Sequence, residues 1–446
     1  MPRTSVSDIL KSVTTLRATA PFTRIGAAVG IALMLAFGFA ERAASQVVHR
    51  PGEYPKLRIV DPSKVRRQPP VAARIALKPF SFVGSKFEHG LNLVEEHKLH
   101  NRLQVMLNNP NIRPLIGGIG DGSGFGGGVA FSTVGVTARS WGFVGDFHVT
   151  GKRYVATNAG LRFTAAPANL GDVTLDILAG YNARPRESFF GTGADSGTQR
   201  TNFDLEERST GAILELEPAR RLRVGTQLKY SSTSISRGKD ARFPSTDAVF
   251  PSSIVPGLRG DVELLESAVY AEFDARQGQS SPAKGFYLAA KLASVDGIGK
   301  GDFAYWRYSI DNRFYLPLGS ERRVLAVRTL LHLTDTKNDG RVPFFRLARL
   351  GDSQTLRGYD TNRFYGKNAA AWNVEYRSAL SNGLGAFAFT DFGQVFDRKA
   401  DFNTRNFRVT YGGGFEVKSK KAVFLRAYVA RSDERTRLMI SFGPTF

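Results

Sequence analysis

The sequence of 446 residues contains no cysteine and has few long apolar runs. Without cysteine the chain cannot form disulfide bonds or a thiolate-ligated metal site. Only residues 25–40 form an apolar run that approaches the length of a membrane-spanning helix, and no later segment does so. These absences exclude a disulfide-stabilised scaffold and a bundle of membrane helices.

Acidic residues are scarce relative to basic ones. The chain has 61 Lys+Arg against 40 Asp+Glu, which gives a formal net charge of +21. Such a surplus is typical of nucleic-acid binding, but here the basic residues alternate along the chain instead of clustering on one helix. We therefore expect no nucleic-acid partner, and we interpret the charge as complementary to anionic lipids and lipopolysaccharide, or as part of a basic lumen.

Residues 1–45 have the order of a secretory signal peptide. Basic residues from Arg3 to Arg24 precede the apolar run 25–40, and small residues at 43–45 follow it. A single membrane anchor would share this apolar core, but the run is short for one. We predict cleavage near Ser45.

The next two segments differ from each other in pattern. Residues 46–85 are rich in proline and basic residues and predict an extended periplasmic linker. Residues 86–110 have a helical pattern that includes Phe87 and Leu91 on one stripe and ends at Pro110. We expect this amphipathic helix to pack beneath the rim of the domain that follows, and a plug inside that domain is the alternative.

Apolar and polar residues alternate with a period of two from about residue 122 to the end. Between 221 and 230, for example, Leu222 and Val224 share one face and Arg223 lies on the other. Such strands run for ten to fifteen residues, as tilted membrane strands require, whereas strands of soluble proteins usually have about five to six. Because open sheet edges are not tolerated in lipid, residues 111–446 predict an all-β fold, an antiparallel transmembrane β-barrel of the bacterial outer membrane.

Counting backward from the last residue gives fourteen strands. They fall near 436–446, 421–431, 406–417, 384–394, 369–379, 322–333, 302–316, 284–295, 262–276, 221–233, 201–217, 173–184, 154–165 and 142–150. Short turns alternate with long loops between them, which is typical of barrels with short periplasmic turns and long external loops. Since such barrels have an even number of strands, we predict sixteen, and the glycine-rich segment 123–140 must then hold the other two.

The two ends of this predicted barrel carry further signals. Glycines in the first strand offer few side chains for cross-strand packing, so the seam between the first and last strands should open easily. These seam glycines are Gly126, Gly127 and Gly128. We also predict that one face of the last strand is the insertion signal that the outer-membrane assembly machinery recognises, formed by Leu438, Ile440, Phe442 and Phe446.

Four short motifs follow one another in the C-terminal part. They are Gly351–Tyr359 (GDSQTLRGY), Asn373–Tyr376 (NVEY), Phe389–Gly393 (FTDFG) and Arg408–Phe415 (RVTYGGGF). In this order they resemble the barrel domain of the bacterial surface antigen family, which holds outer-membrane assembly and translocation factors. The resemblance runs from about residue 110 to the end and implies outer-membrane biogenesis, or transport of protein or lipid.

Assembly factors of this family carry periplasmic POTRA domains before the barrel, but residues 46–122 show no such module. We therefore expect a POTRA-less member, which leaves room for a separate periplasmic partner.

The resemblance also implies that the loop motif Arg357-Gly358-Tyr359 folds into the lumen. Shielded from water there, Arg357 would need anionic partners, and a planar guanidinium can pair with two carboxylates at once. Glu375 lies on the polar face of its strand and Asp391 on the next strand. We expect Arg357 to pair with both, and a solvated loop arginine is the alternative.

Signals of enzymatic activity are weak. His97 and His100 lie three residues apart on the predicted helix, without a third or fourth metal ligand. His148 and His332 lie on strands, and neither belongs to a motif with a serine nucleophile. We therefore expect no enzyme and no cofactor or metal. Three functions stay open: an assembly or translocation barrel, a passive anion-preferring channel, and a structural barrel or surface receptor without transport.

Overall fold

The computed structural model describes most of the chain after residue 110. The described residues are 111–120, 122–134, 140–167, 171–278, 281–299, 302–381, 383–418, 423–441 and 446. The predicted signal peptide (1–45), linker (46–85) and helix (86–110) lie outside them. Within these ranges no helix is long and apolar enough to cross a membrane.

Sixteen antiparallel strands form one sheet in which each strand pairs with the next strand along the chain. They are β1 (Ile112–Gly117), β2 (Gly126–Ser132), β3 (Trp141–Thr150), β4 (Val155–Ala165), β5 (Asp172–Phe189), β6 (Thr201–Ala219), β7 (Leu222–Arg237), β8 (Asp261–Asp274), β9 (Gly285–Gly297), β10 (Ala304–Pro317), β11 (Arg323–Thr336), β14 (Asn368–Ala379), β15 (Leu384–Phe396), β16 (Arg408–Lys418), β17 (Val423–Arg431) and β18 (Thr436–Ser441). The loop between β11 and β14 holds a separate two-stranded sheet of β12 (Ala348–Leu350) and β13 (Phe364–Gly366). The described helical elements are α6 (Thr246–Val249), η2 (Phe344–Arg346), η3 (Lys399–Asp401) and η4 (Thr404–Asn406).

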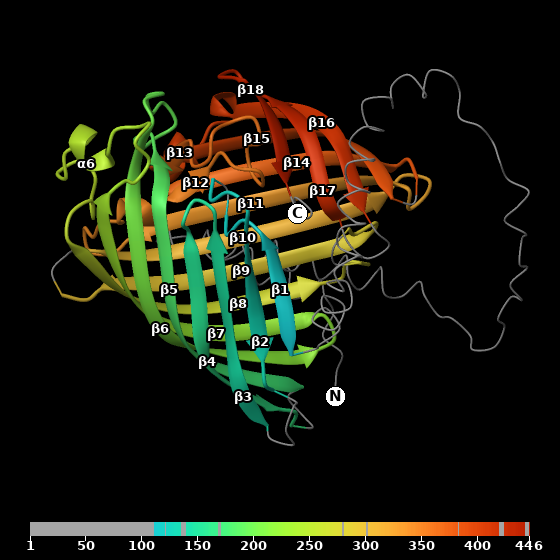
Figure 1. The fold of residues 1–446 in the computed structure, drawn as a ribbon, viewed down its shortest axis with the longest axis horizontal. Helices are drawn as coiled ribbons and strands as arrows, with labels where there is room; N and C mark the ends of the chain where they lie inside the picture. Colours follow the sequence, from blue (N-terminus) through green and yellow to red (C-terminus); the bar gives the residue numbers. More distant parts are fainter. Residues whose placement is uncertain are drawn as a thin grey trace, which may run out of the picture. The chain divides into compact units, whose positions relative to one another are not determined.

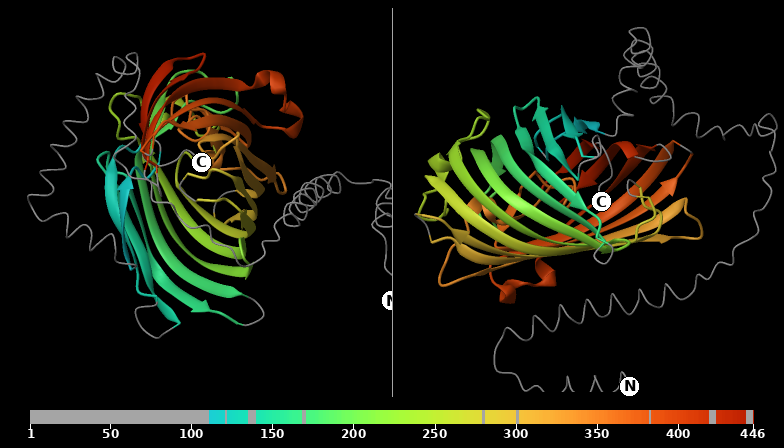
Figure 2. Two further views of the ribbon diagram at one scale, coloured as in Figure 1. Left: turned by 90° about the vertical axis from the view of Figure 1, so that its right-hand side faces the viewer. Right: turned by 90° about the horizontal axis from the view of Figure 1, so that it is seen from below.

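The large sheet is strongly curved, as Figures 1 and 2 show. Its strands follow one another in sequence order from β1 to β18. Within the described residues no hydrogen-bonded ladder joins β18 back to β1, so the sheet is open along this line. The all-β class and the sixteen antiparallel strands confirm the prediction from the sequence.

Alternation along the strands gives the sheet two different faces. In β10, Trp306 and Phe314 are 39% and 52% exposed on the outer face. On the inner face Asp311 accepts hydrogen bonds from Arg313 at 2.6 Å and from Arg328 of β11 at 2.9 Å. The outer face thus presents apolar side chains to lipid, and the inner face carries paired charges.

The two ends of the strands differ in the length of their connections. At one end, here called the turn end, neighbouring strands are joined by short turns such as 220–221 and 318–322. At the other, the loop end, the connections include 190–200, 238–260 and 337–367. This is the asymmetry expected of a barrel with short periplasmic turns and long external loops.

The loop 337–367, here called the cap loop, packs against the inner face at the loop end. Its Phe344 is fully buried, with ring centroids 5.2 Å from Phe189 of β5 and 4.9 Å from Phe203 of β6. β5 and β6 have 18 and 19 residues and run past their predicted bounds of 173–184 and 201–217. These contacts explain the extra length, because the strands continue where protein rather than lipid covers them.

The first two strands lie elsewhere than predicted. We placed both within 123–140, but β1 is Ile112–Gly117 and only β2 lies in that segment. Pro114 concealed β1, because proline cannot donate to a β-ladder and argues against a central strand. At the edge of a sheet proline is tolerated, and β1 pairs with β2 alone.

Candidate functional site

The motif Gly351–Tyr359 forms a tight turn within the cap loop. Gly351 has a φ of +98°, in the region that favours glycine. The Asp352 carboxylate accepts hydrogen bonds from the backbone N–H groups of Gln354 and Thr355 at 2.8 and 2.6 Å. With Leu356 completely buried, this turn directs the next residue, Arg357, toward the inner face of the sheet.

Arg357 lies between two carboxylates of neighbouring strands. Its Nη1 donates to Glu375 of β14 at 2.5 Å, and its Nη2 and Nε donate to the two oxygens of Asp391 of β15 at 2.7 and 3.0 Å. None of the three side chains is exposed. The guanidinium carbon also lies 3.5 Å from the centroid of the Phe389 ring. Charge-assisted, bidentate pairs of this kind are among the stronger hydrogen bonds in proteins.

Two further arginines, not predicted from the sequence, share the same carboxylate. Glu375 accepts hydrogen bonds from Arg377 at 2.7 Å and from Arg426 of β17 at 2.6 Å. Arg426 also lies 3.6 Å from Glu416 of β16. Three arginines thus face three carboxylates, here called the arginine cluster: Arg357, Arg377, Arg426, Glu375, Asp391 and Glu416. The alternation along β14 places Arg377 on the same face as Glu375, so the sequence could have indicated it. Arg426 could be assigned only from the pairing of β16 with β17.

Gly358 and Tyr359 attach the cap loop to the turn between β17 and β18. A Cβ at Gly358 would lie 2.9 Å from the Arg431 backbone, so only glycine allows this approach. The Ser432 hydroxyl donates to the Gly358 carbonyl at 3.1 Å, and the Tyr359 hydroxyl donates to Asp433 at 2.5 Å. The motif therefore contacts two structures, the arginine cluster through Arg357 and the last hairpin through its other two residues.

Two ion pairs extend the contact with the last hairpin. Arg363 lies 2.8 Å from Glu434, and Arg435 lies 2.8 Å from Asp360. Together with the contacts of Gly358 and Tyr359, these pairs form what we call the hairpin latch. The latch fixes the position of the β17–β18 turn relative to the cap loop.

Phe446 does not share a face with the other predicted residues of the insertion signal. Leu438 and Ile440 are 76% and 64% exposed on the outer face of β18, whereas Phe446 is only 4% exposed. Its ring packs in a cluster with Tyr315, Val324 and Ala326 on the inner face, and its backbone oxygen accepts a hydrogen bond from Arg377 at 3.3 Å. The expectation of a shared face was wrong for Phe446, because it extended the alternation of β18 to the last residue. Phe442 lies outside the described residues, and the role of these side chains in insertion stays a prediction.

The predicted seam glycines do not lie at the seam. Gly126, Gly127 and Gly128 belong to β2, which pairs with β1 on one side and β3 on the other. A Cβ at Gly126 or Gly128 would overlap the β3 backbone at the carbonyl oxygens of Val149 or Phe147. Gly126 and Gly128 therefore allow close packing of β2 against β3 instead of weakening the seam.

The true seam lies between β1 and β18, which have six residues each. A cavity of about 730 Å³ opens between the two edges. Ile116 and Gly117 line it on the β1 side, Met439 and Ile440 on the β18 side, and residues 352–354 of the cap loop border it. We call it the seam cavity.

The histidines on the strands have local partners. His332 Nδ1 lies 2.9 Å from the Ser309 hydroxyl on the neighbouring strand, and His148 Nε2 lies 3.1 Å from the Gly117 carbonyl. A serine hydrolase also needs an acid that orients its histidine and donors for an oxyanion, and this pair alone supplies neither. In the described part of the chain, no group of three or more histidine, aspartate or glutamate residues is placed to hold a metal ion.

Comparison with known proteins places this architecture in a family. No curated protein matches the sequence. Among solved structures, BamA from Haemophilus ducreyi lacking POTRA domains 1–3 is similar with a TM-score of 0.55 at 15% identity, over 75% of this chain and 69% of that one. CdiB from Acinetobacter baumannii follows with a TM-score of 0.42 at 11% identity, over 75% and 59%. The Omp85 superfamily domain matches residues 146–441. The chain therefore belongs to the Omp85 superfamily, and it is a β-barrel protein of the bacterial outer membrane.

Proposed function

We propose that this protein is an assembly or translocation barrel that passes protein or lipid into or across the outer membrane through the seam between β1 and β18. One observation carries the proposal. The two edge strands have six residues each, and a cavity of about 730 Å³ separates them instead of a ladder within the described residues.

Backbone groups along an open sheet edge find no hydrogen-bond partners in lipid. An unpaired N–H or C=O group in hydrocarbon costs several kcal/mol, so an open sheet edge is unfavourable there. Within the described residues β1 and β18 are short, which limits this cost, whereas β5 and β6 have 18 and 19 residues. Short edges also form few hydrogen bonds when they pair, so such a seam opens and closes at low cost.

A passive anion-preferring channel receives less support from the inner face. That function would need a lumen lined with unpaired cations, but several inward lysines pair with carboxylates. Lys229 lies 2.7 Å from Glu207, and Lys291 lies 2.7 Å from Glu266. The cap loop also covers the inner face at the loop end. We expect no steady anion conductance from the purified protein in planar bilayers, and a stable open pore would favour the channel.

Cross-linking the seam tests the proposal directly. The chain lacks cysteine, so a pair introduced as Ile116→Cys and Ile440→Cys would contain its only thiols. Both side chains line the seam cavity and are well exposed. Joining them in cells with a flexible bis-maleimide should abolish the ability of the protein to complement its own depletion, measured as viability and as the protein and lipopolysaccharide content of the outer membrane.

The matched control joins two strands that are already paired. Thr226 of β7 faces Val269 of β8 in the ladder, so the pair Thr226→Cys and Val269→Cys fixes a contact that does not need to open. Cross-linking this pair should leave complementation unchanged. Full activity of the seam-locked protein would contradict transport through the seam and favour a structural barrel or surface receptor.

A further inference from the structure

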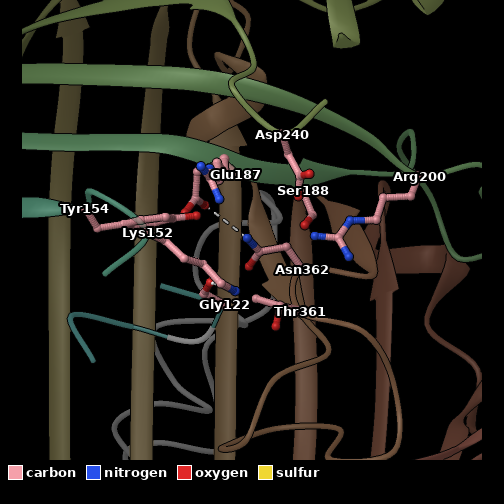
Figure 3. A pocket seen from close by; sticks show the side chains of 10 residues that line it. Gly122, Lys152, Tyr154, Glu187, Ser188, Arg200, Asp240, Thr361 and Asn362 are labelled. Atoms are coloured by element: carbon pink, nitrogen blue, oxygen red, sulfur yellow. Dashed lines mark hydrogen bonds between the residues drawn. The ribbon is translucent and has the colours of Figure 1, made fainter. Parts of the chain in front are cut away.

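The seam cavity continues into a second pocket at the loop end. Gly122, Lys152 and Thr361 line both of them. The second pocket, shown in Figure 3, is also lined by Arg186 and Arg200, and we call it the cationic pocket. In Figure 3, Lys152 and Arg200 approach this space from different segments of the chain. The seam cavity and the cationic pocket thus share one wall.

The three cations of this pocket have unused hydrogen-bonding capacity. The Lys152 ammonium donates to the Gly122 carbonyl at 2.7 Å but forms no ion pair with any described residue. The Nε atoms of Arg186 and Arg200 are buried and have no hydrogen-bond partner in the described part of the chain. Buried donors without a partner are uncommon in proteins, and two of them beside a lysine that forms no ion pair within the described residues indicate an anionic ligand.

The carboxylates beside the pocket are already engaged by other groups. Glu187 accepts hydrogen bonds from Arg349 at 3.2 Å and from Asn362 at 3.0 Å. Asp240 accepts two from Arg242, at 2.9 and 2.8 Å. The three cations therefore leave a positive surplus. Burial, together with the nearby arginines, accordingly lowers the pKa of Lys152, which lies in the turn between β3 and β4.

The seam cavity next to these cations is lined by exposed apolar side chains and by polar ones such as Gln354 and Arg437. Ile116, Phe125 and Ile440 are 70%, 59% and 64% exposed. A soluble anion would not use these side chains, whereas a lipid offers acyl chains for the cavity and a phosphate for the cations. The cationic pocket has a volume of roughly 10 Å³, about that of one water molecule, so one phosphate oxygen can enter it toward Arg200 while the rest of the phosphate sits at its mouth beside Lys152 and Thr361.

We propose that the seam cavity and the cationic pocket together bind one lipopolysaccharide molecule, with a phosphate of its lipid A at Lys152 and Arg200 and its acyl chains along Ile116 and Ile440. The position of the pocket at the loop end favours lipopolysaccharide over other lipids. Long loops mark the external end of such barrels, where the lipid leaflet consists mainly of lipopolysaccharide. The site lies on the seam of the proposed function, but binding does not require that the seam opens.

Native mass spectrometry of the full-length protein in detergent tests this site. Deep-rough lipopolysaccharide, phosphatidylglycerol and phosphatidylcholine would each be titrated into delipidated protein. The wild type should bind lipopolysaccharide with clear preference over both phospholipids. Lys152→Gln and Arg200→Gln should each weaken this binding about tenfold, as expected for the loss of one charge-assisted contact with a phosphate, whereas Lys152→Arg should retain it.

Arg341→Gln is the matched control, because Arg341 is a half-exposed cation of the cap loop that lines neither pocket. It should bind lipopolysaccharide like the wild type, and the folding of every variant is checked by its heat-dependent gel mobility. Equal losses in Arg341→Gln, unchanged binding by folded Lys152→Gln, or equal affinity of the wild type for phosphatidylglycerol would each overturn the assignment. Failure of the seam cross-link alone would overturn transport and leave this site standing.

Discussion

At the scale of single residues, the arginine cluster combines high local charge with complete burial. Arg357, Glu375 and Asp391 have no exposed side-chain surface. Alternation along the strands indicates that both carboxylates face inward, and the family resemblance supplied the loop arginine. Arg426 could not be predicted from the sequence, because only the pairing of β16 with β17 brings it to Glu375. Alternation along a strand shows which face of the sheet a residue lies on, but not which residues of the neighbouring strands lie beside it.

The cluster predicts strong coupling between Arg357 and Asp391. Removing one member of a buried ion pair leaves an uncompensated charge and costs about 3–5 kcal/mol of unfolding free energy. We expect Arg357→Ala and Asp391→Ala each to lower stability by this order, and the double variant to be little worse than either single one. Urea unfolding in detergent, followed by tryptophan fluorescence, measures all three. Strictly additive losses would show that the two residues act independently.

At the scale of elements, the last hairpin is held by the cap loop as well as by its own ladder. β18 pairs with β17 over six residues, and the hairpin latch adds contacts from a segment more than 70 residues earlier in sequence, such as Tyr359 to Asp433.

Most strand positions could be predicted from the sequence because alternation is a local property. β1 was missed because Pro114 masks its pattern, and Phe446 was misplaced because alternation does not reveal where a strand ends.

The latch predicts that β18 becomes more mobile when one contact is removed. Tyr359→Phe deletes the hydroxyl that donates to Asp433 and leaves the ring packing unchanged. Loss of one such hydrogen bond, about 1 kcal/mol, should speed local opening about fivefold. Hydrogen exchange of the β18 amides measures this effect. Tyr376→Phe, on the outer face of β14, is the control and should leave exchange in β18 as in the wild type; equal acceleration in both variants would contradict the latch.

At the scale of the whole molecule, class and strand number followed from strand length, alternation and loop asymmetry. The packing of the cap loop did not, because its contacts join residues far apart in sequence. Arg346 reaches Glu207, for example, and Asn362 reaches Glu187. Nothing in the local pattern of residues 337–367 distinguishes a loop that lies in solvent from one that packs inside a curved sheet.

A membrane barrel of this size predicts heat-modifiable mobility on denaturing gels. An unboiled sample of the purified protein should migrate differently from a boiled one, because a sheet with sixteen strands paired in sequence order resists detergent until it is heated. Circular dichroism of the unboiled sample should show predominantly β structure. Identical mobility of the two samples, or a helical spectrum, would contradict the assignment.

The sequence order of the sheet has a consequence for how the molecule folds. Because each strand pairs with its successor, the sheet can grow by adding one hairpin at a time, and each step closes only a short stretch of chain. The cap loop follows a different rule, since its partners come from β5 and β6 as well as from the β17–β18 turn. It can pack against the inner face only after strands from both halves of the chain have formed. Packing of the cap loop is therefore the last step in completing the sheet. An intermediate that stops before this step would expose the cap loop to proteases even though the hairpins of the sheet had already formed.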